Sequence, residues 1–201
     1  MDKLPLEEMW KKQMFTTLCE FAPIPEDEWK KEQKKLHTLK IQKSEYFIKA
    51  GDFPDKLAFI VQGIFRVFYI SESGNESSLV FRDEGRMLSA YSLFLENRNS
   101  KYSIQALEDS TLLYMSLKDW TKLLPRHACW QIINAKYSQM LFVEKENRVT
   151  EFLSEDAETR YTTFADKFPE LIRRIPQYHI ASYIGITPEA LSRIRKKSKL
   201  I

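Results

Sequence analysis

The side chains best suited to chemistry in this 201-residue chain are the arginines and lysines near its C-terminus. From Arg173 onward there are seven basic residues and one acid, a net charge of +6, so the preceding residues carry −3 of the total of +3. Guanidinium and ammonium groups bind phosphate oxygens. This asymmetry indicates an end that binds a polyanion, and a solvated charged tail is the simpler alternative.

Residues 177–196 place these basic side chains in a pattern typical of a helix-turn-helix. Ala181 is small enough for a second helix to cross closely, and Gly185 can end the first helix in the left-handed conformation. Thr187 is suited to cap the second helix, with Pro188 at its first position. The expected interior residues are Ile180, Ile184, Ile186, Leu191 and Ile194. We interpret the segment as a DNA-reading motif rather than an ordinary helical hairpin.

The second helix of such a motif lies in the major groove. Arg193 is suited to guanine and Glu189 to the amino group of cytosine. The expected base contacts are Pro188, Glu189, Ser192 and Arg193. Phosphate contacts, which position the protein without reading sequence, are expected from Tyr178, His179, Thr187, Lys196 and Lys197. The alternative for His179 is an exposed side chain that makes no contact.

Metal and enzyme chemistry find little support. Cys19 and Cys129 form no CxxC pair, and His37, His127 and His179 are dispersed. We therefore predict no enzyme, no cofactor and no metal site, with a cupin-like barrel enzyme as the alternative. No apolar run approaches the roughly 20 residues that span a bilayer, and the N-terminus lacks a signal-sequence pattern. A cytoplasmic protein without a membrane partner is expected.

Three zones must position these residues. Residues 1–40 have a helical pattern. Residues 41–117 contain β-rich runs at 46–48, 57–61, 64–70, 79–81, 102–106 and 111–115, with a short helix at 90–95, and this spacing is typical of an antiparallel barrel or sandwich. Gly74-Asn75 predicts a hairpin. Residues 128–153 form a long helix, followed by shorter ones at 159–168 and 170–172. The long helix has an apolar stripe of Trp130, Ile133, Tyr137, Met140, Leu141 and Val149, and we expect it to pair with a second copy, through the first five of these residues, rather than only with its own barrel.

A barrel, a long helix and a helix-turn-helix together resemble the Crp/Fnr (cyclic AMP receptor protein) family of transcription regulators. The resemblance rests on Gly51-Asp52, Val61-Gln62-Gly63, residues 106–110 and residues 180–195. Residues 160–161, 168–171 and 184–189 look like the Bacteroidetes-type subgroup.

The resemblance implies an α+β protein. Residues 1–117 would hold the N-terminal helices and a cyclic-nucleotide-binding-like jelly-roll β-barrel, 118–153 a long dimerisation helix, and 154–201 the DNA-binding domain. It further implies a homodimer that reads a palindromic operator in double-stranded DNA, and it leaves contact with RNA polymerase open.

The residues that bind the effector in this family are replaced by others in this chain. Its ribose-binding Gly-Glu and phosphate-binding Arg-Ser pairs align with Ser89-Ala90 and Ser100-Lys101, so we expect no control by cyclic AMP. An unknown effector could still use a pocket at Ser89, Ala90, Arg98, Ser100 and Lys101; solvated side chains are the alternative. The alternative function is a small-molecule-binding or protein-interaction regulator with a degenerate DNA-binding domain.

Overall fold

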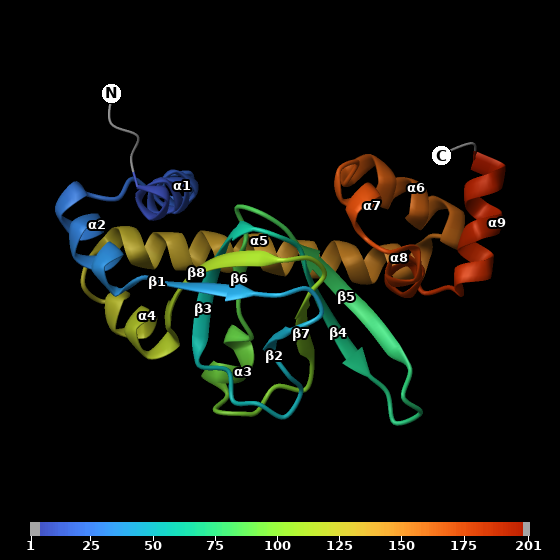
Figure 1. Ribbon diagram of the computed structural model, residues 1–201, viewed down its shortest axis with the longest axis horizontal. Helices are drawn as coiled ribbons and strands as arrows, with labels where there is room; N and C mark the ends of the chain where they lie inside the picture. The colour runs from blue at the N-terminus through green and yellow to red at the C-terminus, as the bar shows by residue number, and fades with distance from the viewer. Residues whose placement is uncertain (1–4, 199–201) are drawn as a thin grey trace.

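The computed structural model describes residues 5–198, and only the backbone of Ser198. Residues 1–4 and 199–201 of the expected terminal domains, Lys199 among them, therefore lie outside the described residues. The chain begins with α1 (Leu6–Cys19), α2 (Glu26–Glu32) and the 3₁₀ turn η1 (Gln33–Lys35). A long helix runs the length of the molecule and carries the N-terminal helices at one end and the C-terminal helices at the other (Figure 1).

Between residues 5 and 198, eight antiparallel strands form two four-stranded sheets. One sheet has the order β1-β8-β3-β6 and the other the order β2-β7-β4-β5, the arrangement of a double-sheet jelly roll. The strands are β1 (His37–Ile41), β2 (Tyr46–Ile48), β3 (Lys56–Gln62), β4 (Phe65–Ile70), β5 (Glu76–Arg82), β6 (Met87–Leu88), β7 (Ser103–Ala106) and β8 (Ser110–Ser116).

The jelly roll is a sandwich and not a closed barrel. Within residues 5–198 no hydrogen-bonded ladder joins the two sheets, so the domain is a sandwich with edge strands. The predicted strands and the hairpin at Gly74-Asn75 are confirmed, the latter connecting β4 to β5. The helical zone ends earlier than residue 40, because residues 37–41 pair with β8 as β1.

Two helices separated by Pro125 follow the sandwich, α4 (Leu117–Leu123) and α5 (Ala128–Ser154). After them come α6 (Ala157–Lys167), α7 (Leu171–Arg174), α8 (Gln177–Ile184) and α9 (Pro188–Ser198). The predicted long helix at 128–153 is confirmed, as is the short helix at 90–95, which is α3 (Tyr91–Leu95). No helix within residues 5–198 is both long and apolar enough to cross a membrane.

The first half of α5 packs on its own chain. Trp130 is 1% exposed and lies with Ile133 in a core formed with α1, α4 and the outer face of the β3–β8 sheet. The hydroxyl of Tyr137 lies 3.1 Å from the backbone nitrogen of Met87, from which it accepts a hydrogen bond. Cys129 is buried in the same core and is a free thiol.

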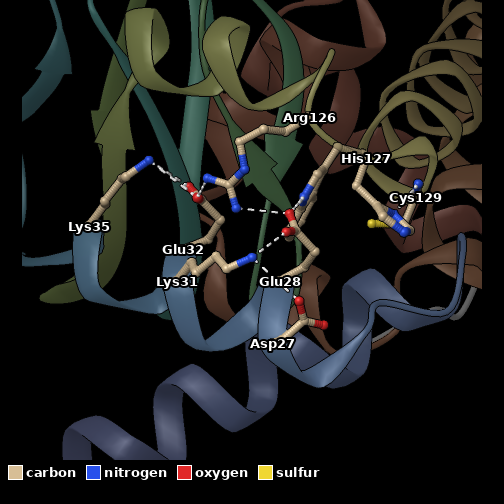
Figure 2. A network of polar contacts seen from close by, with 9 residues as sticks. Asp27, Glu28, Lys31, Glu32, Lys35, Arg126, His127 and Cys129 are labelled. Carbon is tan, nitrogen blue, oxygen red and sulfur yellow. Dashed lines mark hydrogen bonds and ion pairs between the residues drawn. The ribbon is translucent and has the colours of Figure 1, made fainter.

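Charged residues fasten α2 to the start of α5 (Figure 2). The guanidinium of Arg126 lies between the carboxylates of Glu28 and Glu32, 2.8 Å from Glu28 and also paired with Glu32, which is 1% exposed. The Trp130 indole donates to Glu28 over 3.1 Å. That bond, with those from Lys31 and Arg126, lowers the pKa of Glu28 to about 2 against the opposing effect of burial. The network fixes the end of the long helix farthest from α9.

Candidate nucleic-acid interface

A tight turn joins α8 to α9. Gly185 ends α8 with φ of +83°, and the backbone nitrogens of Gly185 and Ile186 both donate to the carbonyl of Ala181, over 2.9 and 3.0 Å. The hydroxyl of Thr187 accepts from the nitrogen of Ala190 over 3.2 Å, the capping role expected from the sequence. Phe152 of α5 lies so close to Gly185 that a β-carbon there would stand 2.8 Å from its ring.

The second helix presents one polar face to solvent. Glu189, Ser192, Arg193 and Lys196 are exposed, and their spacing of three and four residues puts them on the same side of α9. Leu191 points the other way and is buried in the core that α9 shares with α8 and α6. The structure thus brings three of the four expected base contacts together with Lys196, and the fourth, Pro188, is exposed at the start of the helix.

Two charged groups on α9 have local partners. Hydrogen bonds from its own backbone nitrogen and from Thr187 lower the pKa of the exposed Glu189, so this group is an acceptor at neutral pH. Lys197, an expected phosphate contact, forms an exposed ion pair with Glu158 of α6 at 2.8 Å. Such a pair is weak and leaves Lys197 able to exchange partners.

Arginines hold the C-terminal end of α8. Arg148 of α5 donates to the carbonyl of Tyr183, and its guanidinium carbon lies 3.6 Å from the centre of the Tyr183 ring. Arg160 of α6 donates to the carbonyl of Ile184 over 3.0 Å. Cations at a helix C-terminus satisfy carbonyls that have no partner within the helix and interact favourably with its dipole. The orientation of the turn is therefore set by α5 and α6.

The middle of α8 is docked on the edge of the sandwich, beside β5 (Figure 1). The hydroxyl of Ser182 accepts from the nitrogen of Ser78 and donates to the carbonyl of Glu76, both over 2.9 Å. These are outward backbone groups of an edge strand, which would otherwise lack a partner in the sheet.

The structure places His179 in this contact and not on an exposed surface. It is 5% exposed, and Nη1 of Arg66 on β4 donates to its Nδ1 over 2.6 Å. Burial, together with the Arg66 charge, lowers the pKa of His179 to about 4, so the ring is neutral at pH 7. In this arrangement His179 is unavailable to a phosphate. Tyr178, the neighbouring expected contact, is exposed.

A second ionic contact closes the same junction. Arg174 of α7 lies 2.7 Å from Glu84 and also pairs with Glu108, and its hydrogen bonds to these two acids raise its pKa. Beside it, one apolar core contains residues of both parts: Ile64, Phe81 and Leu107 of the sandwich and Tyr161, Phe164, Leu171, Ile175, Ile180, Ala181, Ile184 and Leu191 of the C-terminal helices. The C-terminal helices and the sandwich thus form one packed body.

Most of the residues expected at an effector pocket make contacts within the protein itself. Ser89 donates to the carbonyl of Lys56, Ala90 is fully buried, and the hydroxyl of Ser100 donates to the carbonyl of Tyr102 over 2.6 Å. Arg98 is exposed and paired with Glu96. Lys101 lies 6.0 Å from the ring centre of Tyr69. Two hydroxyls and a methyl group here are engaged within the protein.

The predicted dimer stripe also needs revision. Trp130 and Ile133 lie in the chain's own core, Tyr137 packs against that core, and Met140 and Leu141 are half-buried. The exposed line along α5 has another register, with steps of three and four residues: Ile132, Ala135, Gln139, Phe142, Glu146, Val149 and Leu153. Of these, Phe142 is 66% and Leu153 83% exposed. The spacing of the apolar residues thus identifies a buried face of α5, and this face packs against the sandwich of the same chain.

Two residues at the junction, Arg66 and Ser182, were not predicted from the sequence to have a role there. Arg66 stands alone as a charge inside the apolar run Phe65–Tyr69, and a lone arginine in a buried strand needs a partner from elsewhere. The sequence therefore indicates that Arg66 has a partner in another part of the chain. Ser182 gives no such indication, because a serine on an amphipathic helix usually faces water.

Comparisons with known proteins agree with this architecture. Residues 38–127 match the family "cyclic nucleotide-binding domain", and no curated protein matches the sequence. CLP of Xanthomonas campestris has a similar structure, with 14% identity, 88% of this chain and 92% of that chain covered and a TM-score of 0.70. FixK2 of Bradyrhizobium japonicum is 17% identical, with 81% and 83% covered and a TM-score of 0.70.

A third structure is described as a transcriptional regulator of the crp/fnr family, from Eubacterium rectale. It is 14% identical, with 88% and 84% of the two chains covered and a TM-score of 0.68. At these identities the likeness is one of fold. The chain thus has a match to the cyclic nucleotide-binding domain at residues 38–127, followed by a long helix and C-terminal helices that are arranged as in these solved structures.

Proposed function

We propose that this protein is a sequence-specific DNA-binding transcription regulator of the Crp/Fnr type, and not an enzyme. The observation that carries the proposal is the polar face of α9, with Glu189, Ser192, Arg193 and Lys196 exposed together. Gly185 and Thr187 fix that face relative to α8, so the motif is preorganised. A recognition helix needs such a face because base edges are read by side chains that project from one side into the major groove.

The active form in this proposal is a homodimer in the cytoplasm, joined through the exposed stripe of α5. Phe142, Val149 and Leu153 supply apolar contact in the half of the helix nearest α9. Steps of three and four residues are the pattern of a coiled-coil seam. A two-fold axis along this seam would present two copies of α9 to DNA and would require a two-fold-related operator.

Cyclic AMP is not the effector in this proposal, although the sandwich has the cyclic-nucleotide-binding fold. A ribose hydroxyl needs a carboxylate acceptor, and the matching position holds Ala90, which has none and is fully buried. The phosphate position holds Ser100, whose hydroxyl already donates to Tyr102. One structural relative, CLP, is described as responsive to c-di-GMP, so the fold itself does not fix the effector.

Selection of bound duplexes from a random library tests the proposal. Enrichment of a palindrome whose half-sites lie about one helical turn apart is the expected result. Binding of the recovered site, measured by fluorescence anisotropy at several salt concentrations, should weaken steeply as salt rises. A library without enrichment, together with no salt-dependent DNA binding, would favour the alternative of a regulator that acts through protein partners.

A further inference from the structure

A cavity of about 330 Å³ lies at the junction between the sandwich and α8. Its wall includes Lys43 from the loop between β1 and β2, Arg66 of β4 and Gln105 of β7. Tyr178 and His179, at the N-terminal end of α8, line another side of the cavity, which is open to solvent. A molecule in this cavity would therefore touch the sheet and the first helix of the DNA-reading pair at the same time.

The junction contains buried polar groups that the protein leaves unsatisfied. Among the described residues, five buried side-chain atoms have no hydrogen-bond partner, and three of them belong to this junction: Nε of Arg66, Oγ of Ser78 and Oε1 of Gln177. Arg66 is 2% exposed, and burying a donor of a charged group without a partner is costly. An unmet donor on a residue that lines a cavity indicates a ligand that accepts hydrogen bonds.

The charge around the cavity favours an anion. Arg66 and Lys43 are cations, and no ion pair is formed by Lys43 within the described part of the chain. Glu76 also lines the cavity, and its carboxylate lies 2.6 Å from one nitrogen, Nη2, of Arg66. His179 is neutral because of burial and Arg66. Among the lining residues, one acid against two bases leaves one positive charge in excess; outside the lining, the carboxylate of Asp109 accepts from the backbone nitrogen of Lys43 over 2.9 Å.

We propose that this junction cavity is a binding site for a small anion with a phosphate or carboxylate group. Arg66 and Lys43 would bind the anionic group, and Gln105 and Tyr178 would contact the rest of the molecule. The volume falls in the range of small-molecule sites. A bound anion would hold α8 on the sheet, where His179 is unavailable to DNA phosphate, and would therefore weaken DNA binding. Only the effect on DNA binding rests on the proposed function; the binding of the anion does not.

Histidine NMR on the full chain tests the site directly. His37, on β1, and His127, at the start of α5, lie outside the cavity lining, so they are internal references for His179. Inorganic phosphate and citrate are titrated at constant ionic strength. Either probe should shift the His179 ring signals saturably and leave the other two unchanged, and comparison of the two probes distinguishes a phosphate from a carboxylate ligand.

Matched lysine variants make the test specific. Lys43→Ala should weaken the response about tenfold, as expected from losing one charge-assisted contact. Lys101→Ala removes an equally simple cation at the position suggested by family alignment and should change nothing. Equal effects of the two variants, or a shift of all three histidines together, would overturn the proposal.

Binding to the operator gives a separate readout. With anion at ten times its dissociation constant, exclusive binding to the docked state should reduce DNA affinity about tenfold. At the same anion concentration the reduction should fall to about twofold in Lys43→Ala, because its site binds the anion about ten times more weakly. If no variant binds DNA at all, the proposed function fails while the NMR result still decides the site. Unchanged DNA affinity with a saturated site would refute the coupling to α8.

Discussion

Phe152 and Gly185 are in direct contact, because the Phe152 ring occupies the space where a β-carbon of Gly185 would lie, at 2.8 Å from Cε1. Gly185→Ala therefore requires the Phe152 ring, which is 44% exposed, to move, in addition to the cost of a left-handed backbone. We expect a loss of about 2–3 kcal/mol in the free energy of unfolding, measured by urea denaturation.

Gly51→Ala is the matched control for that variant. Gly51 has φ of +99°, and a β-carbon there would have no neighbour within 4 Å. It should cost only the conformational part, about 1–2 kcal/mol. Equal losses at both positions would show that the contact with Phe152 contributes nothing.

Arg193 and Lys196 should differ in what they contribute to DNA binding. Arg193→Ala is expected to relax specificity at one base pair by about 1–3 kcal/mol, because a bidentate contact to guanine is lost. Lys196→Ala should weaken binding to all sequences alike and lower the salt slope by about 1. Competition titrations against single-base variants of the operator check both. A uniform loss in Arg193→Ala would reassign it to a phosphate.

The oligomeric state should depend on Phe142. This side chain is 66% exposed on α5, and Phe142→Glu would place like charges across a two-fold seam. Sedimentation equilibrium should show a dimer for the native chain and a monomer for the variant at micromolar concentration. Leu95→Glu changes an equally exposed side chain on α3 and should leave the dimer intact. A native chain that sediments as a monomer would contradict the proposed interface.

Arg126→Ala should be destabilising. It removes the cation that the buried Glu28 and Glu32 share, and each acid keeps one partner, Lys31 or Lys35. Because these partners remain and Arg126 is 34% exposed, we expect a loss of about 1–3 kcal/mol, below that of a fully buried pair. The exposed pair of Arg98 and Glu96 supplies the comparison, and Arg98→Ala should change the unfolding free energy by less than about 1 kcal/mol. Similar values for the two variants would mean that the α2 network is solvated in solution.

His179 should make stability depend on pH. Its pKa is about 4 in the folded chain against 6.5 ordinarily, so the unfolded chain binds more protons between these values. The stability from a neutral His179 is complete above pH 6.5 and is lost as pH falls toward 4, by at most about 3 kcal/mol. The difference between the native chain and His179→Gln, measured from pH 4 to 8, isolates this contribution from carboxylates. A difference that does not vary with pH would contradict it.

Local rules predicted the elements whose signals lie within a few residues. Gly74-Asn75 specifies its hairpin by turn chemistry alone, and Gly185 with Thr187 specifies the joint between α8 and α9. The two-residue strand β6 was missed because so short a run has no period to detect. Residues 37–41 were missed because β1 forms only through pairing with β8, about 70 positions away in sequence.

Long-range contacts explain the errors at the site. The apolar residues of α5 reveal a buried face, yet periodicity cannot tell whether the covering partner is the same chain or a second copy. Trp130 is covered by α1, α4 and the sandwich. His179 was placed among phosphate contacts from its position on a helix, and its real environment is decided by Arg66, 113 residues earlier.

The hydroxyl of Ser182 meets two outward backbone groups of β5. An uncovered edge strand is a template for further strands, and proteins protect such edges to avoid aggregation. Any rearrangement that lifts α8 from the sandwich to free its N-terminal residues for DNA also uncovers this edge. In the proposed mechanism, switching and solubility would therefore be linked: an open form would need DNA, a second subunit or a short lifetime to keep β5 from joining the sheet of another copy.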